Sequence, residues 1–369
     1  NYKKQLESKR NRNTTKSYLN YKIAYCYLKL SLPELAEPYF EKSLEQNYTD
    51  PIIHYHYAQT LQMNQKYYES LLQFEKFKEL EPDNRLSDIG LSSINFSFAM
   101  LKEPSRYEVK IVARLSSPES DYSPFFEQRN YKKVYFTSTR YTQIHELDNL
   151  ESGDYCSNIF FSELDRSKQW ENPKPLPGPI NTSNEEGASC LNFRSSNLYF
   201  TRCTNNDKSN KGCRIYLAKK AGSFWGRISE VEIPGIPDDV SIGHPAISDD
   251  ELTLYFSAEG LPAGHGGKDI YRVTRSRKNM NFGLPQNMGP EINTEGDEVY
   301  PYIRRNGDLF FSSNGHIGMG GLDIYKAEKI NTSKYKVENL GSPINSAHDD
   351  FGIVFMGNRE EGFLSSRRN

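Results

Sequence analysis

The stretch Leu309-Phe-Phe-Ser-Ser-Asn-Gly-His-Ile-Gly-Met-Gly-Gly-Leu-Asp-Ile-Tyr325 reads as a short apolar strand, a glycine-rich turn and a second strand. Both strands recur along the chain. The first has four further copies, at Val134–Ser138, Leu198–Arg202, Leu254–Ala258 and Gly362–Ser366. The second is marked by an isoleucine that recurs at nearly constant spacing, as Ile159, Ile215, Ile270 and Ile324. A repeat of about 55 residues therefore organises the chain from residue 121 onward.

Each repeat predicts four short strands. A further strand such as Val299–Arg304 opens the unit, and a tight polar turn such as Arg305-Asn-Gly-Asp308 follows it. An aligned aromatic residue marks the fourth strand, as Trp170, Trp225, Phe282 and Tyr335. Four strands per repeat predict a β-propeller. We expect five blades, starting near residues 121, 184, 240, 297 and 348, with the last one truncated; six blades stay open if more sequence follows. The alternating segment Tyr107–Leu115 is a candidate closing strand.

Glycine marks the boundary between two kinds of structure. Of the 25 glycines, only Gly90 precedes residue 150. Because glycine is disfavoured in helices, the first hundred residues predict helices and the rest predict turn-rich β structure. Pro104 supplies a hinge, since proline cannot continue a helix. The sequence therefore predicts an α + β multidomain chain, with a helical repeat domain at residues 1–103 and an all-β propeller at residues 104–369.

The helical part has a shorter period of its own. Ala24, Ala36 and Phe40 recur 34 positions later as Ala58, Ser70 and Phe74. This pattern resembles the tetratricopeptide repeat, in which small residues let two helices approach and an aromatic residue fills the groove between them. The chain departs from the family pattern at the usual Trp position, where it has Asn20 or His54.

Tandem helix pairs of this kind form a concave surface lined by the first helix of each pair. The register predicts that six residues lie on it: Tyr18, Tyr21, Tyr25, Tyr55, Gln59 and Gln62. Tyrosine offers a large apolar area with a polar tip, which suits contact with a protein or peptide. The alternative is that several of these side chains only pack between helices.

Composition excludes two classes of partner. The chain has 46 Lys and Arg against 48 Asp and Glu, so it has no basic excess with which to bind nucleic acid. It has no run of about 18 apolar residues, so the sequence predicts no transmembrane segment. The first residue is Asn1, and no signal peptide is recognisable after it.

The sequence gives no strong sign of catalysis. The glycine runs Gly264–Gly267 and Gly318–Gly321 lie between strands, whereas a phosphate cradle needs a following helix N-terminus. Asp269 and Asp323 precede the recurring Ile-Tyr pair, and we expect their carboxylates to accept hydrogen bonds from the loop backbone. We therefore expect neither a catalytic site nor a cofactor, and we do not expect an enzyme.

The histidines and cysteines give weaker signals. The seven histidines lack metal-site spacing, so we expect no metal. Calcium at Asn205–Asp207 or Asp349–Asp350 is a weak alternative. Cys203 and Cys213 bracket a polar loop and could form a disulfide, although two free thiols on neighbouring strands fit the spacing equally well.

The order of the two parts carries a family resemblance. The quoted phrase Phe310–Tyr325 resembles TolB-type, WD40-like propeller repeats of bacterial envelope proteins. After tetratricopeptide-type helices, it is similar to the PorE-like, OmpA-family envelope proteins of Bacteroidetes, which are components of the type IX secretion system. The resemblance covers residues 14–369 and is specific for architecture.

The resemblance implies a function and a location. It implies a non-catalytic periplasmic scaffold that serves type IX secretion or gliding. The scaffold would be associated with the outer membrane, and a lipid anchor is one way in which it could be attached. The implied partner is an outer-membrane β-barrel or PorP-type protein, with peptidoglycan bound through a C-terminal domain not in this sequence. The alternative is a carbohydrate-binding or carbohydrate-degrading propeller module of the envelope.

Overall fold

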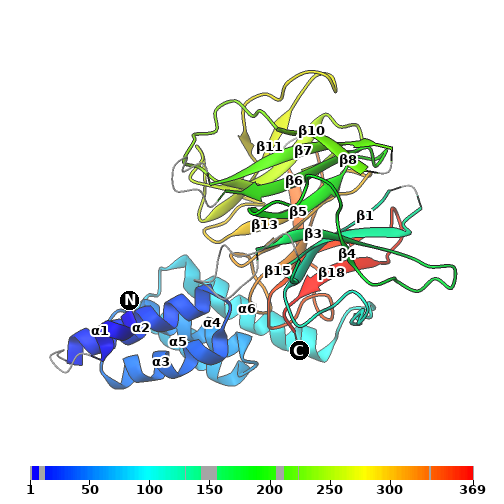
Figure 1. Cartoon of the computed structure of the whole chain (residues 1–369). Coiled ribbons are helices and arrows are strands. Elements are labelled where there is room, and N and C mark those ends of the chain that lie inside the picture. The colour runs from blue at the N-terminus through cyan, green and yellow to red at the C-terminus, as the bar shows by residue number, and fades with distance from the viewer. Residues whose placement is uncertain are drawn as a thin grey trace.

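The computed structural model describes residues 2–7, 13–128, 130–142, 156–204, 212–222, 224–331 and 334–368. Helices occupy the first part of the chain and strands the second (Figure 1). The helices are α1 (Tyr2–Leu6), α2 (Asn13–Lys29), α3 (Pro33–Glu45), α4 (Ile52–Met63), α5 (Tyr67–Leu80) and α6 (Arg85–Lys102). None of them, within the described residues, has both the length and the apolar character that a bilayer crossing requires.

The helices pack as antiparallel neighbours, α2 on α3 and α4 on α5, with α6 against the second pair. Ala24, Ala36 and Phe40 are fully buried in one cluster, and Ala58 and Phe74 are buried in the next. The residues of the helical period thus form the contacts between paired helices, because small side chains permit close approach and a phenyl ring fills the space beside them. The structure confirms helices in this part of the chain.

The strands form four sheets of four strands each. These are β1 (Asp121–Phe126), β2 (Lys133–Ser138), β3 (Asn158–Glu163) and β4 (Lys174–Pro175); β5 (Glu185–Leu191), β6 (Asn197–Cys203), β7 (Cys213–Ala221) and β8 (Phe224–Glu230); β9 (Ile242–Ile247), β10 (Thr253–Glu259), β11 (Lys268–Thr274) and β12 (Gln286–Asn287); and β13 (Glu298–Ile303), β14 (Leu309–Ser313), β15 (Asp323–Lys329) and β16 (Tyr335–Asn339). Every pairing within a sheet is antiparallel. The prediction of a β-propeller is confirmed.

A fifth, two-stranded sheet completes the ring. It consists of β17 (Asp350–Phe355) and β18 (Gly362–Ser366), and it lies between β13 of the fourth blade and β1 of the first. The structure therefore contains four complete blades, and the predicted count of five is not confirmed.

Residues 107–115 form no strand, so the closing strand predicted there is absent from the described sheets. The side chains of Tyr107 and Val109 instead pack beside Phe355 and Leu364.

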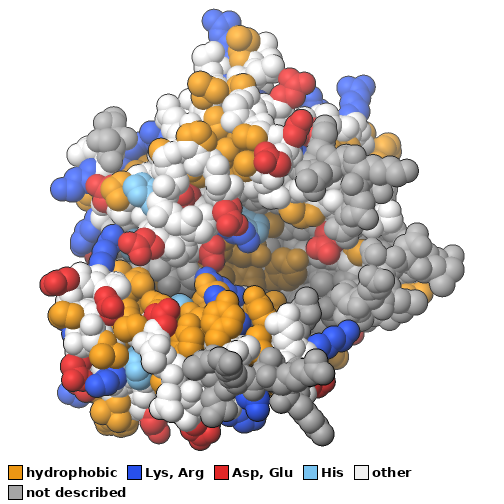
Figure 2. Space-filling model, turned by 90° about the vertical axis from the view of Figure 1, so that its left-hand side faces the viewer, with side chains coloured by type: hydrophobic (Ala, Val, Ile, Leu, Met, Phe, Trp, Pro, Cys, Tyr) orange, Lys and Arg blue, Asp and Glu red, His pale blue; other side chains and the backbone are white. Residues whose placement is uncertain are grey.

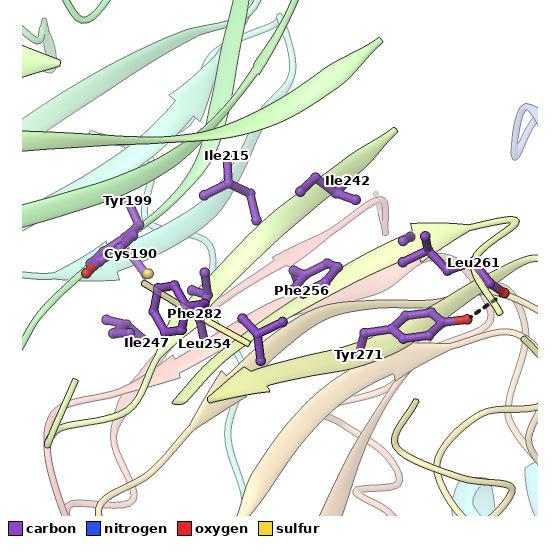
Figure 3. Close-up of a cluster of buried hydrophobic side chains, with 12 residues drawn as sticks. Cys190, Tyr199, Ile215, Ile242, Ile247, Leu254, Phe256, Leu261, Tyr271 and Phe282 are labelled. Atoms are coloured by element: carbon purple, nitrogen blue, oxygen red, sulfur yellow. Dashed lines mark hydrogen bonds between the residues drawn. The ribbon is translucent and has the colours of Figure 1, made fainter. Parts of the chain in front are cut away.

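Buried side chains hold neighbouring blades together. Between the second and third blades, Cys190, Tyr199 and Ile215 meet a larger set from the third blade (Figure 3). That set comprises Ile242, Ile247, Leu254, Phe256, Ala258, Leu261, Tyr271, Val273 and Phe282. The phenol oxygen of Tyr271 is satisfied within the cluster, since it donates to the carbonyl of Leu261 at 3.1 Å. Removal of this apolar surface from water supplies the main stabilisation of the ring.

An Ile-Asn pair recurs in the connections between blades, as Ile180-Asn181, Ile292-Asn293 and Ile344-Asn345, and its asparagine has a structural role. Asn293 accepts a hydrogen bond from the N–H of Ile270 at 2.8 Å and donates one to its carbonyl at 2.9 Å. The same two bonds join Asn345 to Ile324 and Asn181 to Ile159. Each asparagine thus satisfies the buried N–H and carbonyl of one isoleucine, at the place where the chain passes from one blade to the next.

The helical part rests on the fourth blade and the two-stranded sheet. The N–H of Gly318 donates to Oγ of Ser93 at 3.2 Å, and Nε2 of Gln62 donates to the carbonyl of Gly318 at 3.3 Å. The Arg367 guanidinium donates to the carbonyl of Leu30 at 3.0 Å. The glycine-rich turn quoted first is therefore the docking point for α4 and α6.

Candidate functional site

The candidate site is the side of α2 and α4 that lies next to the propeller. In Figure 2 a hollow opens at the height where the helices meet the propeller in Figure 1, and hydrophobic side chains gather along its lower edge. The contact of Gln62 with Gly318 shows that this face of α4 looks toward the propeller. Tyr25 of α2 and Gln59 of α4 are 34 positions apart and so occupy equivalent positions in the helical repeat. The face of α4 that contains Gln59 therefore extends onto α2.

An aromatic cluster lies at the centre of this face. The ring of Tyr21 stacks on Tyr48 at 4.7 Å and on Tyr25 at 6.2 Å between ring centroids. Oη of Tyr21 and Nδ1 of His56 share a hydrogen bond of 3.1 Å, which ties α2 to α4. Burial, together with the charges of Lys29 and Lys22, lowers the pKa of His56 to about 3. The imidazole is therefore neutral at physiological pH, and the cluster is a packed, uncharged layer beneath the exposed side chains.

The outer part of the face is partly exposed and has two lysines, while the carboxylate of Asp50 lies near the buried Tyr21. Tyr18 is 43% exposed, and Tyr25 is partly exposed. Nζ of Lys22 lies 5.5 Å from the ring centroids of Tyr18 and Tyr21, and Nζ of Lys29 lies 5.8 Å from that of Tyr25. Neither α2 nor α4 contains an acidic residue. A ligand on this surface would therefore meet tyrosine rings and lysine ammonium groups side by side.

Three of the six predicted surface residues are buried. Tyr21 is 5% exposed and forms the cluster just described. Tyr55 packs against Phe74 and Phe77, and burial raises its pKa to about 12. Gln62 is buried against Ser97 and the propeller. In this structure these three side chains stabilise the fold, in agreement with the packing alternative.

The other three, Tyr18, Tyr25 and Gln59, retain exposed surface. The sequence reasoning missed Lys22 and Lys29 as members of this face. The signal was present, because each lysine lies four positions after a tyrosine on α2.

The glycine turns and their aspartates have a structural role. Oδ2 of Asp269 accepts a hydrogen bond from the N–H of His265 at 2.8 Å, and Oδ2 of Asp323 accepts one from the N–H of Met319. The carboxylate thus holds the turn that precedes its own strand.

Cys203 and Cys213 are joined by a disulfide between β6 and β7. The weak calcium alternative at Asn205–Asp207 lies outside the described residues. Asp349, the other calcium alternative, accepts a hydrogen bond from the N–H of Leu322 at 2.9 Å. Within the described ranges, no three His, Cys, Asp or Glu side chains are grouped so that they could hold a metal ion.

Comparisons with known proteins find matches among solved structures. No protein-family model matches the sequence, and no curated protein matches it. Among solved structures, the Penicillium chrysogenum α-L-arabinanase complexed with arabinobiose is 15% identical, with 71% of this chain and 80% of that chain covered at a TM-score of 0.40. A protein of unknown function from Dyadobacter fermentans is 12% identical, with 64% and 69% covered at a TM-score of 0.41.

A puromycin-hydrolysing peptidase of Mycobacterium tuberculosis is 14% identical at a TM-score of 0.37. The match covers 62% of this chain but only 32% of the peptidase, so this chain spans about a third of that protein. At such identities the likeness concerns the fold, and it assigns none of these activities to this chain.

The expectation that the chain is not an enzyme is corrected by these structures. An arabinanase, an α-L-arabinofuranosidase from Lactobacillus brevis and an endo-arabinanase from Bacillus licheniformis are all among the similar propellers. The expectation rested on missing motifs, and a fold hosts many functions, so missing motifs do not decide the question. Enzyme activity is therefore not excluded for this chain.

Proposed function

We propose that the chain is a cell-envelope adaptor that binds an acidic segment of a protein partner on the α2–α4 face. The observation that carries the proposal is the combination of Tyr18 and Tyr25 with Lys22 and Lys29 on helices that have no acidic residue. Tyrosine rings give contact area at small entropic cost, and ammonium groups attract carboxylates. The buried Tyr21–His56 pair holds α2 and α4 in register beneath them.

The family and the location are part of this proposal. The helices would be tetratricopeptide-type repeats, and the propeller would be of the TolB or WD40-like type found in PorE-like OmpA-family proteins. The partner would then be an outer-membrane β-barrel or PorP-type protein, met in the periplasm during type IX secretion or gliding. The support is the sequence resemblance and the presence of paired helices and a propeller in one chain.

The test is affinity purification after mild cross-linking, from the organism's own cells, with the partner identified by mass spectrometry. The double variant Lys22→Glu with Tyr25→Ala should lose the partner that the unaltered protein captures. Lys42→Glu is the matched control, because Lys42 also lies over a tyrosine ring, that of Tyr39 at 5.6 Å, but on α3. Equal capture by the double variant and the control would remove the α2–α4 face as the binding site.

A second candidate is a carbohydrate-binding or carbohydrate-degrading propeller. The similar structures named above are nearer to this candidate than to an adaptor, but they concern the fold. The specific observation in its favour is a series of neighbouring aromatic rings, His244, Tyr300, Phe351 and Tyr122, which come from the innermost strands β9, β13, β17 and β1. Glycoside hydrolysis also needs a pair of carboxylates. Among the residues lining the pocket at one end of the axis, Asp249 has the only carboxylate, and it is ion-paired with Arg305 at 2.9 Å.

Hydrolysis can be tested directly. Release of reducing sugar from arabinan by the purified chain, abolished by Asp249→Asn, would support the degrading form. Release that persists in the variant would place the reaction elsewhere.

A further inference from the structure

The innermost strands of the ring share a bulge beside the propeller axis. One residue in each of the strands β1, β5, β9, β13 and β17 has a positive φ: Ser123 (52°), Ala188 (43°), His244 (53°), Tyr300 (52°) and Gly352 (62°). Because all five strands have this bulge, the backbone conformation belongs to the fold. The presence of large rings at two of these positions does not follow from the fold, since bulky residues rarely adopt positive φ.

The rings around the axis form one continuous series. His244 of β9 stacks on Tyr300 of β13, with centroids 4.0 Å apart and planes inclined by 16°. Tyr300 lies 4.9 Å from Phe351 of β17, and Phe351 lies 6.3 Å from Tyr122 of β1. All four side chains are partly exposed. Four different sheets therefore contribute to one curved aromatic surface.

A small cavity adjoins these rings. Its volume is about 30 Å³, and its lining includes Ser189, His244 and Tyr300 but no charged side chain. Ser189 and His244 both line the cavity, and Oγ of Ser189 and Nδ1 of His244 are buried without a hydrogen-bond partner in the described part of the chain. A buried polar atom without a partner is unfavourable. A ligand that brings a hydroxyl group to these two atoms would supply the missing hydrogen bonds.

The chemistry of the cavity selects a neutral ligand. Burial and the charge of Lys268 lower the pKa of His244 to about 3, so its imidazole is uncharged at physiological pH. The volume accommodates roughly one or two water-sized groups, and hence a single hydroxyl or hydroxymethyl substituent. Aromatic faces beside neutral hydrogen-bonding atoms suit a hydroxylated ring with an apolar C–H face, which is the chemistry of a sugar residue.

We propose that His244, Tyr300 and Phe351 bind a neutral sugar residue at the propeller axis, with one of its hydroxyl or hydroxymethyl groups in the cavity beside Ser189. The inference rests on the carbohydrate-binding candidate. It is independent of the acidic-peptide face, because no residue of α2 or α4 takes part.

The experiment is calorimetric titration of the full chain with three neutral disaccharides, arabinobiose, cellobiose and chitobiose. At least one should bind with a millimolar or lower Kd. Tyr300→Ala should weaken that binding about tenfold or more, since it removes a stacking ring and opens the cavity. Ser189→Ala should weaken it several-fold by removing one hydroxyl group. Tyr68→Ala, at a ring that is 75% exposed on α5, is the control and should bind as the unaltered chain does.

The outcomes separate the alternatives. Failure of all three sugars to bind the unaltered chain overturns the inference, as does undiminished binding by Ser189→Ala and a folded Tyr300→Ala. If Tyr300→Ala does not fold by circular dichroism, Ser189→Ala alone decides the matter. Binding of the tripeptide Gly-Tyr-Gly in place of any sugar also overturns it and assigns the rings to an aromatic side chain. Partner capture through Lys22 is measured separately, so failure here leaves the adaptor proposal standing.

Discussion

The backbone N–H of Ser123 donates a hydrogen bond of 2.9 Å to Oγ of Ser365, and so joins β1 to β18 across 242 positions of the chain. The same device joins neighbouring blades elsewhere. The N–H of Ala188 donates to Oγ1 of Thr137 at 2.9 Å, and the N–H of His244 donates to Oγ1 of Thr201 at 3.0 Å. The two-stranded sheet is therefore attached to the first blade in the way that complete blades are attached to each other.

This bond predicts an effect of Ser365→Ala on stability. The substitution leaves the buried N–H of Ser123 without its partner, so the free energy of unfolding should fall by about 1–2 kcal/mol. Ser312→Ala is the matched control, because Ser312 has the equivalent place in β14 and its Oγ has no partner within the described residues. Urea unfolding of both variants measures the difference. An equal loss in the two would show that the bond does not help to close the ring.

A second prediction concerns the joint between helices and propeller. Gln62→Leu removes the donor to the carbonyl of Gly318 and so weakens the contact between the helices and the fourth blade. If the contact loses about 1.4 kcal/mol, the fraction of molecules in which the two parts have separated should rise roughly tenfold. Limited proteolysis near Pro104 should speed up accordingly. Gln73→Leu serves as control, since Gln73 pairs with His54 inside the helical part. Identical cleavage rates in the two variants would contradict the role of Gln62.

The blades were predictable because their signal is local. An apolar strand, a turn and a second apolar strand are specified within one short segment of the chain. In the four complete blades the predicted copy is the second strand of its sheet, as Leu309–Ser313 is in β14, and the fifth copy, Gly362–Ser366, is β18 of the two-stranded sheet. The isoleucines of the repeat are fully buried for the same reason: each occupies the same place in its own blade. Periodicity therefore predicts the strands and the buried positions within each blade.

Contacts between different repeat units were not predictable in this way. The helical register places Gln62 on the inner face, but the group that covers it, Gly318, lies 256 positions later. The axial rings pose the same difficulty, since His244 and Tyr300 come from different blades and become neighbours only when the ring closes. Contacts between units depend on tertiary geometry, and a repeat pattern does not contain that geometry.

A third prediction separates packing from binding among the tyrosines. Tyr55→Ala should lower the free energy of unfolding by about 3–5 kcal/mol, because it leaves a cavity beside Phe74 and Phe77. Tyr18→Ala should change stability by no more than about 0.5 kcal/mol, since its side chain is 43% exposed. Thermal or urea unfolding compares the two. A large loss in Tyr18→Ala would mean that this ring also belongs to the core and would weaken the proposed binding face.

The last prediction concerns a buried carboxylate that lacks the arginine found near its counterparts. Asp121 pairs with Arg140 at 3.0 Å, Glu186 pairs with Arg202 at 2.7 Å, and Asp350 pairs with Arg368. Glu298 occupies the same place at the start of β13. It accepts hydrogen bonds from Thr294 and Ser313, and it has no ion pair with any described residue.

Burial, only partly offset by these hydrogen bonds, raises the pKa of Glu298 to about 7. Its pKa in the unfolded chain is near 4.5. Between these two values the folded chain holds a proton that the unfolded chain has released, so stability must fall as pH rises through this window. The contribution is complete below the unfolded pKa and is lost once the folded group ionises. A shift of this size corresponds to at most about 3 kcal/mol.

Glu298→Gln should therefore flatten the dependence of unfolding free energy on pH and stabilise the chain by up to about 3 kcal/mol near pH 8, while changing little near pH 5. Glu186→Gln is the matched control and should destabilise at both pH values, because it leaves the Arg202 guanidinium without its carboxylate. Urea unfolding at the two pH values measures both variants. Parallel pH profiles for Glu298→Gln and the unaltered chain would show that this carboxyl group ionises normally, and that the missing arginine has no energetic consequence.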